Sequence, residues 1–170
     1  PGEWKKESNG TYTVDENDNQ VYIEYASVRD TPVLMNQFID KLNHYRTQAT
    51  QDPLKPDDAV KAFVDLHTAL VRIHPFYDGN GRMARLLANI PLLVSGHPPL
   101  LIPNEHRLEY IRSLAKYEVA VGQIKPGDDL VPDHTSLETF TTLCQQSWKQ
   151  SLMLVAKARE HQAIRLKDIG

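Results

Sequence analysis

The apolar pattern of this chain changes near residue 31, and this change constrains the fold more than any other feature. Residues 11–14 and 21–25 are rich in β-branched and aromatic side chains, and the polar run between them, 15–20, is typical of a turn. This pattern predicts a β-hairpin over about residues 11–25. Two strands alone are marginally stable in water, so the hairpin must pack against a larger body.

Beyond residue 31 the apolar residues recur at helical spacing. Thr31-Pro32 is a favourable helix start, because a capping side chain precedes a proline at the first helical position. A second helix is expected from about Asp57, and a third from Asn80 to about residue 95. The sequence therefore predicts a mainly α fold with one appended hairpin.

Two further helices follow. Asn104 is the expected cap of a fourth helix, and a capping-box sequence over 135–138 opens a last one that runs to about Glu160. The side chains expected to face the core from the second helix are Val60, Phe63, Val64, His67, Leu70 and Val71. Those expected to face it from the fourth are Leu108, Ile111, Leu114 and Ala115. His67 is interpreted as a packed, hydrogen-bonded core histidine without a catalytic role.

Length and composition fit one domain, residues 1–170, in which 41% of residues are apolar and 24% are charged. The net charge of −3 argues against a protein that coats nucleic acid, and no apolar stretch is long enough to span a bilayer. We therefore expect neither nucleic acid nor a membrane as partner. The single cysteine, Cys144, favours a reducing compartment, and a cytoplasmic protein is expected. Because the chain begins with Pro1, we expect a fragment of a longer chain.

The residues that carry the most chemistry are 74–85, His-Pro-Phe-Tyr-Asp-Gly-Asn-Gly-Arg-Met-Ala-Arg. Gly79 and Gly81 flank Asn80 where a loop is expected to become a helix, and glycine lets a ligand approach the backbone closely. A helix N-terminus offers unpaired N–H groups and a partial positive charge. This segment therefore predicts a phosphate cradle.

Charged side chains complete the expected site. Arg82 and Arg85 should share one side of the helix with Asn89 as a polar strip, and guanidinium groups match phosphate oxygens. The apolar strip expected beside it is Met83, Leu87, Ile90 and Val94. Asp78 would repel phosphates unless Mg²⁺ bridges the two. His74 is a candidate general base for a hydroxyl that attacks phosphorus.

These twelve residues resemble the signature of the Fic family, His-x-Phe-x-(Asp/Glu)-Gly-Asn-Gly-Arg-x-x-Arg, at every defined position. The resemblance includes the hairpin before the motif and continues through Arg107, Tyr110 and Leu114, fading after about residue 125. It implies a mainly α Fic fold, with a helical bundle around the motif helix. Residues 1–170 would form a single Fic domain with a flap at about 11–25 and an active-site loop and helix at 74–95.

The resemblance also implies a protein adenylyltransferase, which transfers AMP from ATP to a Ser, Thr or Tyr hydroxyl of a target protein and releases pyrophosphate. His74 would deprotonate the hydroxyl, and Asp78 would hold Mg²⁺ on the α- and β-phosphates. The backbone of Gly79, Asn80 and Gly81 would cradle the phosphates. Arg82 would contact the β-phosphate, and Arg85 would reach the γ-phosphate.

Two further parts of the site are implied by the resemblance alone. The hairpin would be a flap that holds the target backbone in extended form, with Val21, Tyr22 and Ile23 as its docking strand. Tyr110 would lie beside the nucleotide base. The family's usual second tyrosine is Ile111 here and a nearby polar position is Glu118, so the choice of ATP over another nucleotide stays open.

Regulation and rival functions also stay open. Many family members carry an inhibitory helix with the pattern Ser/Thr-x-x-x-Glu-Gly/Asn, and this chain has no such run. An inhibitor could lie upstream of Pro1, come from a separate antitoxin-like protein, or be absent. The rival functions are a phosphotransferase, against which Gly81-Arg82 argues, removal of AMP from a modified protein, and non-catalytic nucleotide sensing.

Overall fold

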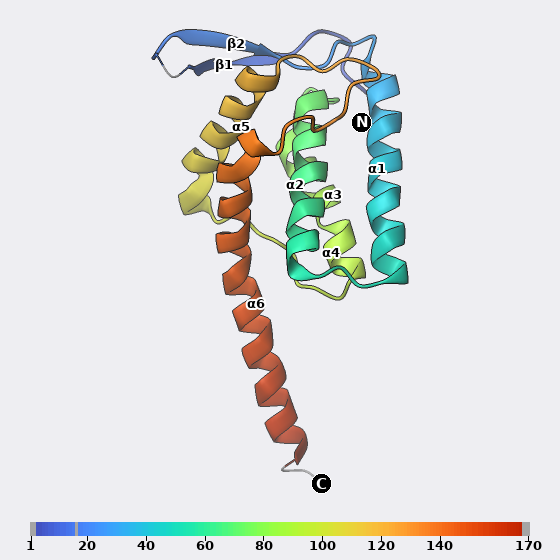
Figure 1. Ribbon diagram of the computed structural model, residues 1–170, viewed down its shortest axis with the longest axis vertical. Coiled ribbons are helices and arrows are strands. Elements are labelled where there is room, and N and C mark those ends of the chain that lie inside the picture. The colour runs from blue at the N-terminus through green and yellow to red at the C-terminus, as the bar shows by residue number, and fades with distance from the viewer. Residues whose placement is uncertain (1–2, 16, 168–170) are drawn as a thin grey trace.

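The computed structural model describes residues 3–15 and 17–167 and shows a helical body with a β-hairpin across one end (Figure 1). Strand β1, Gly10–Val14, pairs antiparallel with β2, Gln20–Glu24, and Tyr12 lies opposite Tyr22. Ile23 is buried against the body, whereas both tyrosines are exposed. The hairpin and the mainly α fold class are confirmed.

The helix bounds are α1 Thr31–Gln51, α2 Pro56–Ile73, α3 Asn80–Ala88, α4 Ile90–Val94, α5 Arg107–Val121 and α6 Glu138–Lys167, with 3₁₀ turns η1 Asn104–His106 and η2 Thr135–Leu137. Helix α2 is central, since α1, α3, α4 and α6 all pack against it. Its predicted inward residues are buried, except that Val71 is only partly so. Because α2 is held on several sides, its C-terminal end is a rigid base for the residues that follow.

The single helix expected from Asn80 to residue 95 is wrong, because the helix breaks at Asn89. Pro91 has no N–H to donate to the carbonyl four residues earlier, so the α3 hydrogen-bond ladder cannot continue. The Asn89 amide spans the break by donating to the carbonyls of Arg85 and Leu100 and accepting from the Leu100 N–H. Asn89 is buried, so its amide serves these internal hydrogen bonds and does not extend the polar strip of Arg82 and Arg85 at the surface.

The predicted apolar strip of the motif helix is matched in part, since Met83 and Leu87 pack against the core and Val94 does not. Met83, Leu87 and Ile90 are partly buried and Val94 is exposed. The residues buried in the core are Ala84, Ala88 and Leu92. Small alanines let the short α3 approach α2 closely, and this close packing, rather than a stripe of large residues, fixes the motif helix.

The face of α5 that is buried in the structure also differs from the predicted inner face. Leu108 and Ile111 are exposed, Ala115 is partly buried, and the buried positions are Tyr110, Ser113, Leu114, Tyr117 and Glu118. Three of these carry polar groups that find partners inside the protein, so the apolar pattern alone does not mark the face.

The three predicted caps differ too, and Asn104 begins the 3₁₀ turn η1, whose N-cap is Pro103. The last helical segment has His134, not Thr135, at its N-cap, and the Asp133 carboxylate before it accepts from the N–H groups of Thr135 and Ser136. The Thr31 hydroxyl donates to the carbonyl of Ser27 instead of capping α1.

Candidate active site

The loop between α2 and α3 turns sharply at His74. This residue has the left-handed backbone conformation, φ 49° and ψ 57°, and its N–H donates to the Leu70 carbonyl at 2.9 Å. A non-glycine residue rarely adopts this conformation and keeps it only where its surroundings impose it. The turn directs the chain back at once, so that the motif helix α3 begins at Asn80, six residues later.

The Asn80 side chain closes this loop. Its Oδ1 accepts from the Phe76 N–H at 2.9 Å, and its Nδ2 donates to the Phe76 carbonyl at 2.7 Å. Asn80 is buried. The side chain therefore shapes the loop, and what Asn80 can offer a phosphate is its backbone N–H.

Two residues that the sequence analysis did not single out hold the loop from outside. Asn9 donates to the carbonyls of His74 and Phe76 at 3.2 and 3.3 Å. The Lys5 ammonium donates to the Ile73 carbonyl at 3.1 Å and to Asn9 Oδ1 at 2.7 Å. Burial lowers the pKa of Lys5 to about 8, with the Glu24 carboxylate opposing. Nothing in the polar N-terminal segment distinguishes these two residues in sequence.

The His74 ring is oriented by its own helix. Nδ1 lies 3.1 Å from the Val71 carbonyl, and because a carbonyl only accepts, Nδ1 carries the proton of the neutral ring. Nε2 therefore keeps its lone pair. Burial lowers the pKa of His74 to about 4, with the hydrogen bond to Val71 opposing and the charge of Lys5 reinforcing the shift. At neutral pH the ring is an unprotonated base.

Tyr25, which directly follows β2, covers one face of that ring. The two rings are stacked with centroids 3.8 Å apart and an interplanar angle of 5°. The backbone of Tyr25 is fixed as well, since its N–H donates to the Asn9 carbonyl and its carbonyl accepts from Gln123. Burial is the main cause that raises the pKa of the Tyr25 hydroxyl to about 12. This contact links the flap to the candidate base, and the sequence analysis missed it.

Asp78 and Arg82 lie at the exposed mouth of the loop. They form an ion pair at 3.1 Å, although their side chains are 91% and 75% exposed. Asp78 also accepts from the Gly79 N–H at 2.6 Å. An exposed pair of this kind contributes little to stability, so both charges can change partners when a phosphate or a metal ion arrives.

The first turn of α3 gives access to its backbone. Gly79 has φ +81°, a conformation that favours glycine, and its carbonyl accepts the Met83 N–H at 2.9 Å. At Gly81 an added Cβ would lie 3.6 Å from Arg85 Nη1 and 3.7 Å from the Tyr110 hydroxyl, which is ordinary contact. The protein's own packing therefore does not require glycine at position 81.

Arg85 ends a buried polar chain. Its Nη1 donates to the Tyr110 hydroxyl at 3.4 Å, and that hydroxyl lies 3.0 Å from Nε2 of His67. Burial lowers the pKa of His67 to about 3, and the charge of Arg85 adds to the effect, so the neutral ring accepts from Tyr110. His67 is thus the hydrogen-bonded core histidine that the sequence predicts. A pocket of about 170 Å³ lies beside this hydrogen-bonded series of side chains. Arg85 and Tyr110 line it together with Arg107 and Asn104.

Tyr110 is almost wholly buried, with its ring against His67 and Phe140. In this position it holds Arg85, and its place beside a nucleotide base stays a prediction. Glu118, the other residue expected near the base, is buried and paired with Arg72 at 3.5 Å. Burial raises the pKa of Glu118 to about 7, with Arg72 opposing.

The three flap residues differ in exposure. Val21 is partly buried, Tyr22 is exposed and packs against Tyr12 with ring centroids 5.1 Å apart, and Ile23 is buried. Among the described residues β2 pairs only with β1, which leaves its other backbone edge without a strand. That edge has the hydrogen-bonding groups an extended peptide needs.

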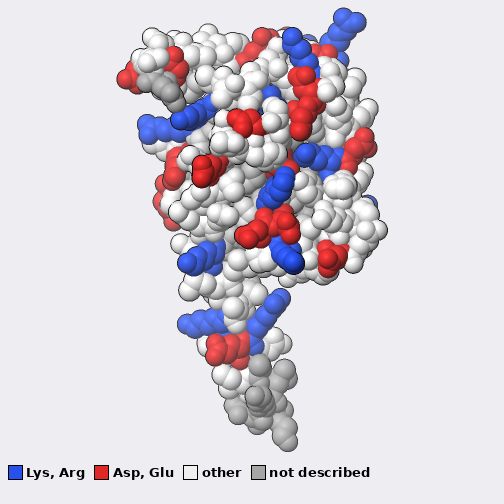
Figure 2. Space-filling view, in the orientation of Figure 1, with Lys and Arg blue, Asp and Glu red and all other residues white. Residues whose placement is uncertain are grey.

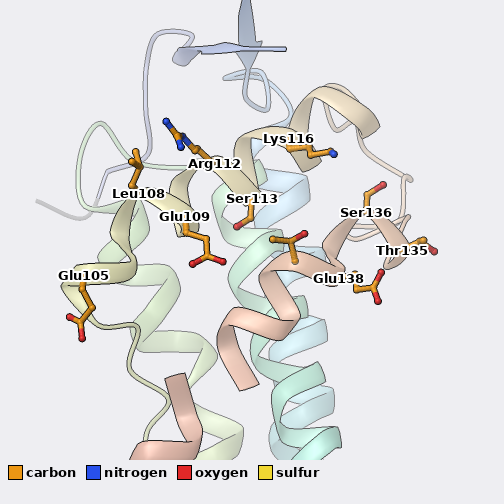
Figure 3. Close-up of a pocket in the computed structure, with 10 residues that line it drawn as sticks. Glu105, Leu108, Glu109, Arg112, Ser113, Lys116, Thr135, Ser136 and Glu138 are labelled. Carbon is orange, nitrogen blue, oxygen red and sulfur yellow. The ribbon is translucent and has the colours of Figure 1, made fainter. Parts of the chain in front are cut away.

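A separate groove of about 640 Å³ lies between α5 and the start of α6 (Figure 3). Charged and hydroxyl side chains from both elements line it, among them Glu109, Ser113 and Glu138. No residue of the 74–85 motif lines it, so this groove is separate from the predicted phosphate cradle.

Comparison with known proteins agrees with this geometry. A sequence model of the Fic/DOC family matches residues 2–92, which include the hairpin and the whole motif. The chain belongs to the Fic/DOC family. A protein adenylyltransferase fic-1 of Caenorhabditis elegans is 34% identical over 116 residues, and a protein adenylyltransferase Fic of Drosophila persimilis is 44% identical over 120. These matches cover 68% and 69% of this chain, which spans only 22% of each relative's length.

Among solved structures, a Fic domain containing signaling protein from Bacteroides thetaiotaomicron is similar over 94% of this chain and 56% of its own. The TM-score is 0.73 at 31% sequence identity. The structural similarity therefore extends into α5 and α6, beyond the residues that the family sequence model matches. Within the described part of the chain, no helix combines the length and apolar character needed to cross a bilayer.

Proposed function

We propose that this Fic domain is a protein adenylyltransferase that moves AMP from ATP to a Ser, Thr or Tyr hydroxyl of a target protein. The observation that carries the proposal is the neutral His74 ring, whose Nε2 keeps its lone pair, in the short loop that leads into the first turn of α3. The names of the relatives support the same reaction. The nucleotide would lie with its phosphates over the first turn of α3.

In this reaction the target hydroxyl gives its proton to Nε2 of His74 while its oxygen bonds to the α-phosphorus. The bond from the α-phosphorus to the oxygen bridging to the β-phosphate breaks, and pyrophosphate leaves. Arg82 would pair with the β-phosphate in place of Asp78, and Arg85, held by Tyr110, would meet the γ-phosphate. The free edge of β2 would hold the target segment, so that its hydroxyl comes close to His74.

Asp78 fits a magnesium site, because its carboxylate is exposed and its ion pair with Arg82 is solvent-exposed and exchangeable. Bound Mg²⁺ would neutralise phosphate charge as the leaving group departs. The described residues hold no cluster of three or more metal-binding side chains, so an ion at Asp78 would take its other ligands from phosphates and water.

We further propose a cytoplasmic setting, in keeping with the buried free thiol of Cys144. We also propose inhibition by an upstream segment or by a separate antitoxin-like protein.

The test uses ATP labelled at either the α- or the γ-phosphate, with Mg²⁺ and a lysate as the source of targets. Label from the α-phosphate should appear on protein, and His74→Ala should abolish it. Transfer from the γ-phosphate instead would replace the proposal with a phosphotransferase. Transfer of neither label, by protein that still binds ATP, would favour nucleotide sensing or AMP removal.

A further inference from the structure

Helix α6 continues well past the body of the protein (Figure 1). Its first half is anchored, since Leu143, Cys144 and Trp148 are buried. Further along, Met153 and Leu154 are 64% and 70% exposed, and Ile164 is 53% exposed. The part of a helix that projects without packing is marginally stable in water. Exposed apolar side chains on it therefore indicate a surface that another element covers.

Met153 and Ile164 lie on one continuous face of the helix, together with charged and polar side chains. Gln150, Met153, Lys157, Glu160 and Ile164 follow one another at alternating steps of three and four residues, and they line a shallow groove on the helix. We call these five residues the α6 stripe. Steps that average 3.5 residues are the repeat by which two helices pack side by side in a coiled coil.

We propose that the α6 stripe binds the α6 stripe of a second copy of this chain, with the two helices antiparallel. When the twofold axis passes between residues 158 and 159, Met153 of one copy meets Ile164 of the other at each end of the contact. Lys157 of one copy then meets Glu160 of the other, twice, at the centre. Such a face is complementary to itself, as a twofold interface requires.

Charge selects this arrangement over a parallel one. In a parallel pair Lys157 would face Lys157 and Glu160 would face Glu160, and both contacts repel. The wider charge distribution agrees: residues 149–170 contain five Lys and Arg against two Asp and Glu, whereas residues 1–148 contain 14 against 20. Figure 2 shows Lys and Arg side chains along the projecting helix. Antiparallel pairing brings this basic end towards the acidic body of the other copy.

The contact is short, and this sets the expected strength. From Gln150 to Ile164 the helix rises only about 21 Å. The surface area that a contact of this length buries lies near about 1,000 Å², the lower limit for specific interfaces. We therefore expect a dimer that forms and dissociates with protein concentration rather than a permanent one.

Charge exchange on the intact chain tests the proposal by sedimentation equilibrium over a range of concentrations. The unaltered chain should dimerise, and Lys157→Glu or Glu160→Lys alone should weaken the dimer at least tenfold. The double variant Lys157→Glu/Glu160→Lys should restore it, and a mixture of the two single variants should form heterodimers. Helix content by circular dichroism and ATP binding should stay unchanged in all variants, because the stripe is remote from the motif.

Three results would overturn the proposal. One is an unaltered chain that stays monomeric at every concentration, which would assign the stripe to another segment or partner. The second is a single variant that dimerises as well as the unaltered chain. The third is a double variant no better than the singles.

Discussion

Replacing Gly81 by alanine isolates the proposed phosphate cradle from the stability of the fold. Gly81 lies in the first turn of α3 and does not have a positive φ. Its added methyl group would meet Arg85 and Tyr110 at 3.6 and 3.7 Å, distances of ordinary contact. The ligand-free protein should therefore accept alanine without rearrangement.

The expected effects on stability and on binding have opposite signs. Alanine is better than glycine inside a helix by about 0.5–1 kcal/mol, and for a first turn we take the lower value. In a domain of this size that raises Tm by about 1–2 °C. A phosphate seated on the α3 backbone would collide with the new methyl group. We therefore expect ATP to bind at least about tenfold more weakly, a loss on the order of 1.4 kcal/mol.

Thermal melts and calorimetric titration with Mg²⁺ and ATP measure the two effects, and Gly79→Ala is the matched control. Gly79 has φ +81°, so alanine there should lower Tm, in contrast to alanine at position 81. Unchanged ATP affinity in Gly81→Ala would refute close approach of phosphate to this backbone. A lower Tm in Gly81→Ala would refute the packing argument.

Three further predictions concern the groups around the motif. Replacing Tyr25 by leucine should lower kcat about tenfold and leave KM for ATP unchanged, because the Tyr25 ring orients His74. The control Tyr25→Phe keeps the stacked ring and should retain kcat. Equal rates for both variants would exclude orientation of His74 by stacking. Since the pKa of His67 is about 3 in the folded chain against about 6.5 when unfolded, its contribution to stability is complete above pH 6.5 and is lost as the pH falls towards 3. Urea unfolding at pH 7 and pH 5 should therefore show a smaller loss for His67→Gln than for the unaltered chain, and an equal loss would contradict the assigned neutral ring. Arg85→Ala should weaken ATP binding more than ADP binding in calorimetry, and equal losses would remove Arg85 from the γ-phosphate.

Sequence periodicity predicted the elements of the fold but not every inner face. It succeeded for α2, where large apolar residues fill the core, succeeded only in part for α3, and failed for α5. The face of α3 that meets α2 is made of Ala84 and Ala88, which carry little hydrophobic signal. The inner face of α5 carries Tyr110 and Glu118, whose polar groups are paired only in the folded chain.

The candidate site shows the same division between local and long-range information. The motif sequence indicated His74, Asp78 and the two arginines, because their chemistry and spacing lie within twelve residues. It could not indicate Tyr25 or Asn9, which reach His74 from about 50 and 65 residues away in the chain. Contacts of that range depend on how the hairpin packs against the end of α2.

The structure also separates residues that the motif presents as one unit. Gly79 and Asn80 are committed to loop shape, through a positive φ and two hydrogen bonds to Phe76. Within the described part of the chain, Asp78 and Arg82 pair with each other at the exposed mouth, and Asp78 also accepts from the loop backbone. Substitutions in the first pair should therefore lower stability even without nucleotide, whereas substitutions in the second should leave the melting curve unchanged and appear only when phosphate and metal bind. The motif thus contains two sets of residues with different physical tasks, one that shapes the loop and one that remains available to ligands.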